Sequence, residues 1–174
     1  MLPDRAAHLR APERSPDVRL VIGNRNYSSW SLRGWLALRF AGIDPEIVRI
    51  PLDTPEFPAQ IRVYSQAAQV PVLIDGATTV WDSLAICEYV AERTGRGWPG
   101  DAELRAHARG SVCEMHSGFA TLRAQMPMNI RARRRVPVDD GLQRQIDRVV
   151  GLWCEALTLH DGAAPGLYGD WGIA

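Results

Sequence analysis

The first half of the chain alternates short apolar runs with stretches of helical apolar spacing. The continuous run at 19–23 is typical of a strand buried on both faces, and the helical stretch after it has Ser28 or Ser29 as N-cap and ends at Gly42. The elements expected in chain order are strand 19–23, helix 30–40, strand 46–50, a weak helix 57–64, strands 71–76 and 78–81, and helix 83–94. This pattern predicts the order β-α-β-α-β-β-α.

The second half has a different period. The glycine-dense segment 95–100 marks a boundary, after which apolar residues recur at helical spacing over 102–126 and from Asp139 or Asp140 to 159. The fold class is therefore α/β followed by all-α. We expect a disordered N-terminal extension at 1–17, an α/β domain at 18–95 and a helical domain at 101–174.

Composition places the chain among soluble globular proteins. Of its 174 residues, 46% are hydrophobic and 23% are charged. The 20 basic residues, all arginine, balance 20 acidic ones, so the whole molecule has no net attraction to nucleic acid or to anionic lipid. No apolar run approaches the roughly 18 residues of a membrane span. We therefore expect neither nucleic acid nor a membrane as partner.

Cysteine and histidine usage argues against a disulfide framework and against a metal site. Cys87, Cys113 and Cys154 lack a C-x-x-C spacing and fall in helical patterns, so we expect buried small hydrophobes in a reducing, cytoplasmic environment. His8, His107 and His160 have no Cys or carboxylate partners at the spacing of metal ligands, so we expect no metal.

The turn between the first strand and the first helix carries the candidate chemistry. Its sequence, Asn26 to Arg33, places hydroxyl groups where the free backbone N–H groups of a helix start converge, and this arrangement suits an anion. Ordinary N-capping explains the same serines, and on this turn alone it is the better explanation.

Three motifs in order resemble the cytosolic glutathione transferase family, most closely its zeta-like and bacterial serine-type members. They are Ser28-Ser29-x-Ser31-x-Arg33, Gln69-Val70-Pro71-Val72-Leu73, and Asp82-Ser83-Leu84-Ala85-Ile86-Cys87-Glu88-Tyr89. The segments Glu114–Phe119 and Pro127–Asn129 are similar to a pattern of bacterial members. The resemblance implies a thioredoxin-like N-terminal domain, a helical C-terminal domain, glutathione as co-substrate and a homodimer.

The resemblance also implies roles for single residues. Ser28 aligns with the serine that holds the sulfur of glutathione, and Ser29 is a second donor to it, while Tyr27 is the rival, because other classes use a tyrosine near this turn. Lowering a thiol pKa from about 8.5 by about two units takes roughly 2.7 kcal/mol. One hydroxyl donating to a thiolate supplies roughly 1.5 to 3 kcal/mol and a helix N-terminus up to about 2, so one serine suffices without a general base.

The other two motifs would bind the remainder of the tripeptide. The main chain of Val70 would pair with the cysteinyl part, which requires a cis bond to Pro71. Asp82 would hold the γ-glutamyl ammonium, and Ser83 the carboxylate at a helix N-terminus.

The helical half would hold a small electrophile. His116, Phe119 and Arg123 lie on the face that borders the electrophile pocket in this family, although a structural histidine explains His116 better than a catalytic one does. The arginine cluster at 131–135 has no interleaved aromatic residues, so we interpret it as a solvated connector.

Three functions compete. The first is a glutathione transferase that conjugates or isomerises an electrophile, as the maleylacetoacetate isomerases of the zeta class do. The second is a thioredoxin-like disulfide reductase, which fits the element order, although Ser28 and Ser31 stand where a redox motif needs cysteines. The third is a non-catalytic binding protein of the same fold.

The C-terminal segment 167–174 resembles the family's lead-in to a further core helix. We therefore expect a chain truncated in its helical half, without the helices that cover Val149, Trp153 and Leu157 in relatives.

Overall fold

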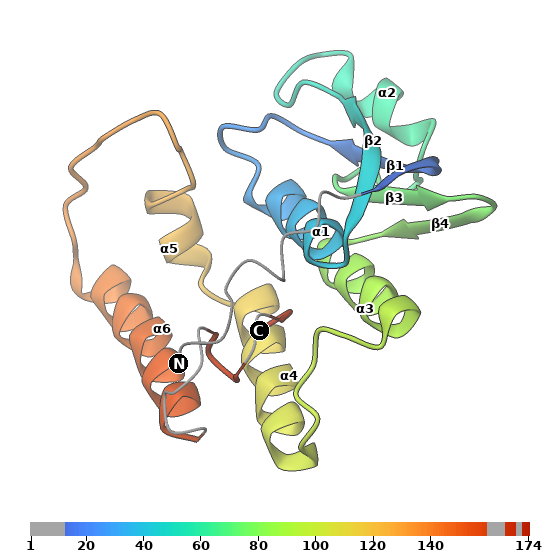
Figure 1. The fold of residues 1–174 in the computed structure, drawn as a ribbon. Helices are drawn as coiled ribbons and strands as arrows, with labels where there is room; N and C mark the ends of the chain where they lie inside the picture. Colours follow the sequence, from blue (N-terminus) through green and yellow to red (C-terminus); the bar gives the residue numbers. More distant parts are fainter. Residues whose placement is uncertain (1–12, 160–165, 170–171) are drawn as a thin grey trace. The chain divides into compact units, whose positions relative to one another are not determined.

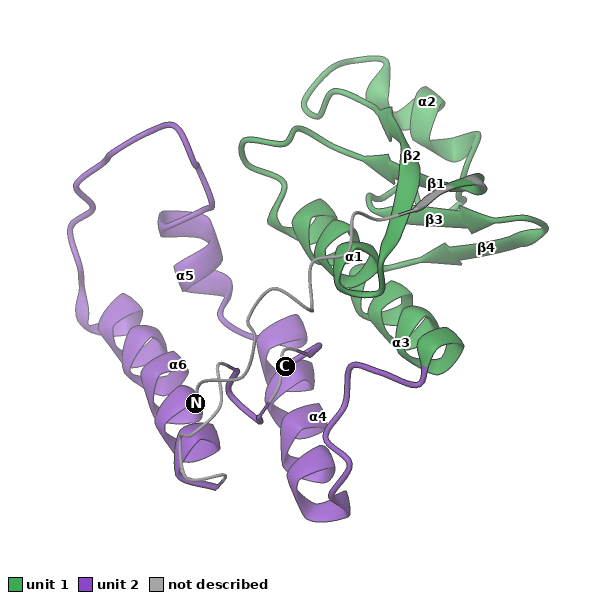
Figure 2. Cartoon of the chain, in the orientation of Figure 1, with its two compact units in different colours: residues 1–94 green, residues 95–174 purple. Residues whose placement is uncertain are grey.

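The computed structural model describes residues 13–159, 166–169 and 172–174. The chain forms two compact units, residues 1–94 and residues 95–174 (Figure 2). Of the N-terminal extension predicted from the sequence, residues 1–12 lie outside the described residues.

The first unit is built on a four-stranded mixed sheet (Figure 1). Its strands are β1 (Glu13–Ile22), β2 (Ile43–Arg49), β3 (Val72–Asp75) and β4 (Thr78–Trp81), in the spatial order β2-β1-β3-β4. β1 runs parallel to β2 and antiparallel to β3, and β3 and β4 form the hairpin expected around Gly76.

Three helices cover the two faces of this sheet. They are α1 (Ser29–Phe40), α2 (Phe57–Arg62) and α3 (Ser83–Thr94), so the predicted order β-α-β-α-β-β-α and the thioredoxin-like fold are confirmed. Successive residues of β1 point to opposite faces. Leu20 packs in one core cluster with α1 and α3, whereas Val21 packs in the other with Ile61 of α2.

The first strand begins earlier than its apolar run. β1 starts at Glu13, so residues 13–17 belong to the strand and not to the disordered extension that we expected. In the backbone register of the two strands, Arg14 lies opposite Asp44 and Arg19 lies opposite Glu46. The stretch 14–19 of β1 therefore lies opposite the shorter stretch 44–46 of β2. Such a bulge is one of the few places where a sheet accepts a proline, and Pro16 lies within it.

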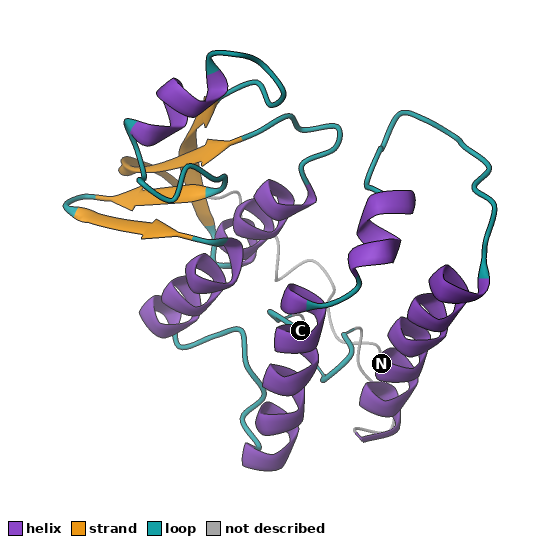
Figure 3. Cartoon of the chain, turned by 180° about the vertical axis from the view of Figure 1, so that it is seen from behind, coloured by secondary structure: helices purple, strands orange, loops and turns teal. Residues whose placement is uncertain are grey.

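The described residues of the second unit form three helices, α4 (Ala102–Ser117), α5 (Ala120–Gln125) and α6 (Asp140–Leu159). The prediction of a single helix over 102–126 is wrong, because the backbone of Gly118 is extended and that of Phe119 is left-handed, with φ of 63°. This break ends the hydrogen-bond ladder of α4 and starts a new helix. Residues 126–139 form a long loop without regular structure (Figure 3), and its arginines at 131–135 are exposed, as expected for a solvated connector.

α6 begins where the sequence predicts. The side chain of Asp139 accepts a hydrogen bond from Leu142 N at 2.8 Å, as an N-cap does. Val149 is buried in a cluster with Phe119 and Leu152, contrary to our expectation of an uncovered position, while Trp153 and Leu157 are exposed.

Candidate functional site

The turn between β1 and α1 is held rigidly by hydrogen bonds. The main-chain oxygen of Asn24 accepts a hydrogen bond from the amide of Ser28 at 2.9 Å. Its side-chain Oδ1 accepts a second one from the amide of Leu52 at 2.7 Å. A Cβ atom on Gly23 would lie 2.8 Å from the side chain of Leu52, so any larger residue here would require that side chain to shift. The turn and the loop after β2 are therefore fixed to each other.

Ser28 is the N-cap of α1, and its hydroxyl belongs to a buried pair. Ser28 Oγ donates to Ser31 Oγ at 2.7 Å and accepts from Ser31 N at 3.4 Å. The amide of Gly23 donates to the same Ser31 Oγ at 3.0 Å. The residues Ser28 and Ser31 are 6% and 4% exposed, so water competes little for these groups.

The positive end of α1 is not neutralised locally. The first turn of α1 contains no acidic residue, and the guanidinium of Arg33 lies 4.4 Å from the ring of Trp30 within the same helix. The helix dipole places partial positive charge at this end. An anion beside Ser28 would therefore find both a hydroxyl donor and a favourable potential.

The neighbours of Ser28 differ from it in burial and in bonding. The amide of Ser29 donates to the main-chain oxygen of Tyr27 at 3.2 Å, so the hydroxyl is the donor group of Ser29 that remains for a ligand. The Tyr27 side chain is 40% exposed. Of the three candidates, Ser28 is the one that the surrounding turn holds in place.

The second motif lies against α1. The Val70–Pro71 peptide bond is cis, as the resemblance implies. Pro71 is fully buried, and a Cβ atom on Gly34 of α1 would lie 3.4 Å from Pro71 and 3.6 Å from Ile86 of α3. The three motifs of the sequence therefore meet around Gly34, within the first unit.

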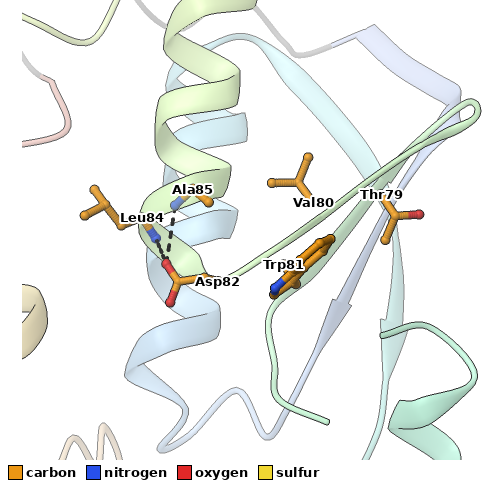
Figure 4. Close-up of a pocket in the computed structure, with 6 residues that line it drawn as sticks. All are labelled: Thr79, Val80, Trp81, Asp82, Leu84 and Ala85. Atoms are coloured by element: carbon orange, nitrogen blue, oxygen red, sulfur yellow. Dashed lines mark hydrogen bonds between the residues drawn. The ribbon is translucent and has the colours of Figure 1, made fainter. Parts of the chain in front are cut away.

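The third motif forms the start of α3. Asp82 has a positive φ of 76°, and its Oδ1 accepts hydrogen bonds from Leu84 N at 2.8 Å and Ala85 N at 3.3 Å (Figure 4). A left-handed aspartate before a helix is uncommon and is typical of a site with a special geometry. The expected ammonium ligand is therefore also the cap of α3.

Ser83 is buried at the start of α3. The residue is 2% exposed, and its Oγ forms no hydrogen bond to any residue that the structure describes. Most buried hydroxyls are satisfied, so an exception at a helix N-terminus is consistent with a place for a ligand acceptor.

An open depression of about 450 Å³ lies beside this helix start (Figure 4). Its wall is formed by the end of β4 and the first turn of α3, and the lining residues are Thr79, Val80, Trp81, Asp82, Leu84 and Ala85. The carboxylate of Asp82 is the charged group of this wall, so the depression suits a cationic group.

The residues expected at the electrophile pocket lie in the second unit. Phe119 is buried in the cluster with Val149 and Leu152, and the guanidinium of Arg123 donates to Gly118 O at 3.1 Å and to Met115 O. Burial lowers the pKa of Arg123. His116 is in the last turn of α4, where a basic side chain interacts favourably with the negative end of the helix dipole.

The cysteines correct one expectation. All three are free, but Cys113 and Cys154 are exposed, and only Cys87 is buried. Burial raises the pKa of Cys87 to about 11, against the opposing charge of Arg33, so its thiol is a poor nucleophile.

Among the described residues, no group of three or more His, Cys, Asp and Glu is placed to hold a metal ion. None of the helices in the described part is long and apolar enough to cross a membrane.

Sequence reasoning did not assign a role to Ser31 or to the amide of Gly23. The available signal was the Ser28-x-x-Ser31 spacing, because residues three apart lie on one side of a helical turn. Only the structure shows that the two hydroxyls bond to each other.

Residues 27–93 match the family described as the N-terminal domain of glutathione S-transferases. Dichloromethane dehalogenases from Methylophilus leisingeri and Methylorubrum extorquens are 38% identical over 65 residues and 42% identical over 50 residues. These alignments cover 36% and 29% of this chain, and 24% and 17% of the relatives, so the match spans at most about a quarter of their length.

Solved structures share the fold over most of the chain. A glutathione transferase homologue from Burkholderia GL BGR1 with bound glutathione has a TM-score of 0.67 at 22% identity, over 91% of this chain and 76% of that one. A theta class glutathione S-transferase from Xanthomonas axonopodis pv. citri with bound glutathione has a TM-score of 0.62 at 22% identity, over 91% and 77%.

The fold defines a protein with a thioredoxin-like first unit and a helical second unit. The family match over residues 27–93 lies within the first unit, and the solved glutathione transferases share the fold of the chain.

Proposed function

We propose that this protein is a glutathione transferase in which Ser28 stabilises the thiolate of glutathione for attack on a small electrophile. The observation that carries this proposal is the buried Ser28 hydroxyl, held at the positive end of α1 by Ser31. Ser29 adds a second hydroxyl one residue further along. Because one hydroxyl and a helix N-terminus supply the roughly 2.7 kcal/mol needed for a drop of about two in the thiol pKa, no general base is required.

The chain's own residues suit the rest of the tripeptide. The main chain of Val70 forms no hydrogen bond to another described residue, so it is available to pair with the cysteinyl part. The orphaned hydroxyl and the amide of Ser83 suit the γ-glutamyl carboxylate at the start of α3. The carboxylate of Asp82 suits the ammonium group, in the depression beside Trp81.

The electrophile is proposed to be a small molecule with a leaving group. Two relatives are named for the dehalogenation of dichloromethane, and this supports displacement at a halogenated carbon. In that step the sulfur of the thiolate forms a bond to carbon, and the carbon–halogen bond breaks, so that the halide leaves with the electron pair. Isomerisation in the manner of maleylacetoacetate isomerases, and with it a zeta-like class, is the alternative use of the same thiolate.

The pocket residues expected in the second unit are proposed to contribute unequally. Phe119 lies at the break between α4 and α5 and Arg123 bridges it, so their role would be to shape this region. His116 is the residue of the three that we propose for contact with the electrophile. A homodimer in the cytoplasm completes the proposal, and the three free cysteines fit a reducing compartment.

The test compares Ser28→Ala with Tyr27→Phe. We expect the unmodified protein to be retained on immobilised glutathione, and Ser28→Ala to lose roughly 10- to 100-fold in kcat/KM for thiol conjugation of a small halogenated substrate. Tyr27→Phe keeps the activity, because Tyr27 is half exposed and lies outside the hydroxyl pair. Stopped-flow or steady-state assays of halide release measure both variants.

Other outcomes identify the competing functions. The reverse pattern, with activity lost in Tyr27→Phe, would reassign the sulfur to tyrosine. A folded protein that glutathione affinity resin does not retain would be a binding or scaffold protein without this chemistry. Reduction of insulin disulfides in the absence of glutathione would point to a disulfide reductase.

A further inference from the structure

The hydroxyl oxygen of Ser31 accepts two hydrogen bonds, which is as many as its lone pairs allow. It accepts from the amide of Gly23 at 3.0 Å and from Ser28 Oγ at 2.7 Å. A serine hydroxyl has two acceptor lone pairs and one proton to donate. Both lone pairs of Ser31 are therefore occupied, and its own proton has no acceptor among the described residues.

The contact between the two hydroxyl oxygens holds only one proton, so the hydroxyl proton of Ser31 has no acceptor among the described residues. Four donors point into the pair: the amides of Gly23 and Ser31 and the two hydroxyl protons. The structure satisfies three of them, at Ser31 Oγ twice and at Ser28 Oγ once. Ser31 is 4% exposed, so bulk water has little access to its hydroxyl proton. One added acceptor beside Ser28 would complete the network.

We propose that Ser31 is a positioning residue that lowers the pKa of bound glutathione by exchanging hydrogen-bond roles with Ser28. The proposal rests on the proposed function. When a thiolate lies beside Ser28, the Ser28 proton turns from Ser31 Oγ to the sulfur. The Ser31 proton then turns to the unused lone pair of Ser28 Oγ, along the O–O contact that the Ser28 proton has left. No proton leaves either serine, no covalent bond forms or breaks, and all four donors have acceptors.

The exchange favours the thiolate over the thiol. A thiolate accepts the Ser28 proton strongly, whereas a thiol is a weak acceptor and gives this proton little reason to leave Ser31 Oγ. Chains of hydroxyl donors also polarise one another, so a Ser28 hydroxyl that accepts from Ser31 is a better donor to sulfur. Ser31 therefore acts on the sulfur only through Ser28.

The test measures the pKa of glutathione bound to the full chain by thiolate ultraviolet absorbance against pH. In Ser31→Ala we expect this pKa to rise by about one unit, a roughly tenfold loss of thiolate near neutral pH. The affinity measured well above that pKa, where the thiol is ionised in both proteins, changes by less than about threefold. A role limited to folding would not move the pKa alone.

Ser65→Ala is the matched control. Ser65 is also a buried serine of the first unit, 8% exposed, and its hydroxyl accepts one amide, that of Ala67 at 3.2 Å. Its removal should leave the pKa of bound glutathione unchanged. Ser31→Cys keeps a weak donor in a slightly larger side chain, so it should give an intermediate pKa and serves if Ser31→Ala does not fold.

A double-variant cycle locates the effect at Ser28. In a Ser28→Ala background, Ser31→Ala should have no further effect on the pKa, because the residue through which it acts is absent. Additive shifts, or an unchanged pKa in both Ser31 variants, would overturn the role of Ser31 while Ser28→Ala still tests the proposed function. Absence of any glutathione binding by the unmodified chain would instead overturn the proposed function itself.

Discussion

A single buried hydroxyl at Ser83 is stabilising only if something binds to it. The group is enclosed at the start of α3 and has no partner among the described residues. An unsatisfied buried polar group costs roughly 1 to 3 kcal/mol, and a protein retains it most readily where a ligand repays that cost.

Ser83→Ala therefore separates stability from binding. We expect the free energy of unfolding to stay within about 0.5 kcal/mol of the unmodified value or to rise, since no hydrogen bond in the described part is lost. We expect the Kd for glutathione to rise roughly 10- to 100-fold, because a hydrogen bond to a carboxylate is removed. Urea unfolding and isothermal titration calorimetry measure the two quantities. A large loss of stability with unchanged affinity would mean that Ser83 is purely structural.

At the level of elements, the join between α4 and α5 shows how a helix break is stabilised. The chain leaves the helix at Gly118 and Phe119, which exposes carbonyl groups at the end of α4. Arg123, one turn into α5, donates to Gly118 O and Met115 O. A guanidinium can bridge two carbonyls because its donors form a rigid fork.

Arg123→Met should therefore destabilise the second unit by roughly 1 to 3 kcal/mol, because the aliphatic stem is kept while two part-buried carbonyls lose a donor. Hydrogen exchange of peptides from residues 102–125, together with urea unfolding, measures the loss. Arg135→Met is the control, as Arg135 is exposed in the loop before α6. Equal effects of the two substitutions would show that the bridge contributes nothing.

At the level of the whole molecule, the buried thiol of Cys87 links folding to pH. Burial raises its pKa from 9.0 to about 11, so between these values the folded chain keeps a proton that the unfolded chain releases. The contribution of this thiol to the free energy of unfolding is therefore fully present below pH 9, and it is lost as the pH rises through 11. By linkage this contribution amounts to about 3 kcal/mol.

Cys87→Ala should accordingly flatten the decline of stability between pH 8 and pH 11, although the variant starts less stable because a core side chain is smaller. Urea unfolding at several pH values measures the difference from the unmodified chain. Cys154→Ala, an exposed cysteine of the other unit, should leave the decline unchanged. Parallel curves for Cys87→Ala and the unmodified chain would contradict the linkage.

Local rules were sufficient for the sheet hairpin and for most helix starts. Asp139 caps α6 and Ser28 caps α1 as expected, because capping depends on a few neighbouring residues. The same rules missed the early start of β1 and the break at Phe119. Pairing with β2 extends the strand through the bulge around Pro16, and a left-handed phenylalanine is tolerated only because a core cluster holds its ring.

The sequence by itself determined the order of the elements and the three motifs, since apolar period, caps and turns are properties of short segments. Packing in three dimensions brings these motifs together around Gly34, lets Ser28 and Ser31 share a hydrogen bond, and leaves Ser83 Oγ without a partner among the described residues. Distances between groups far apart in the chain, and the count of donors against acceptors, depend on packing, which no local pattern contains.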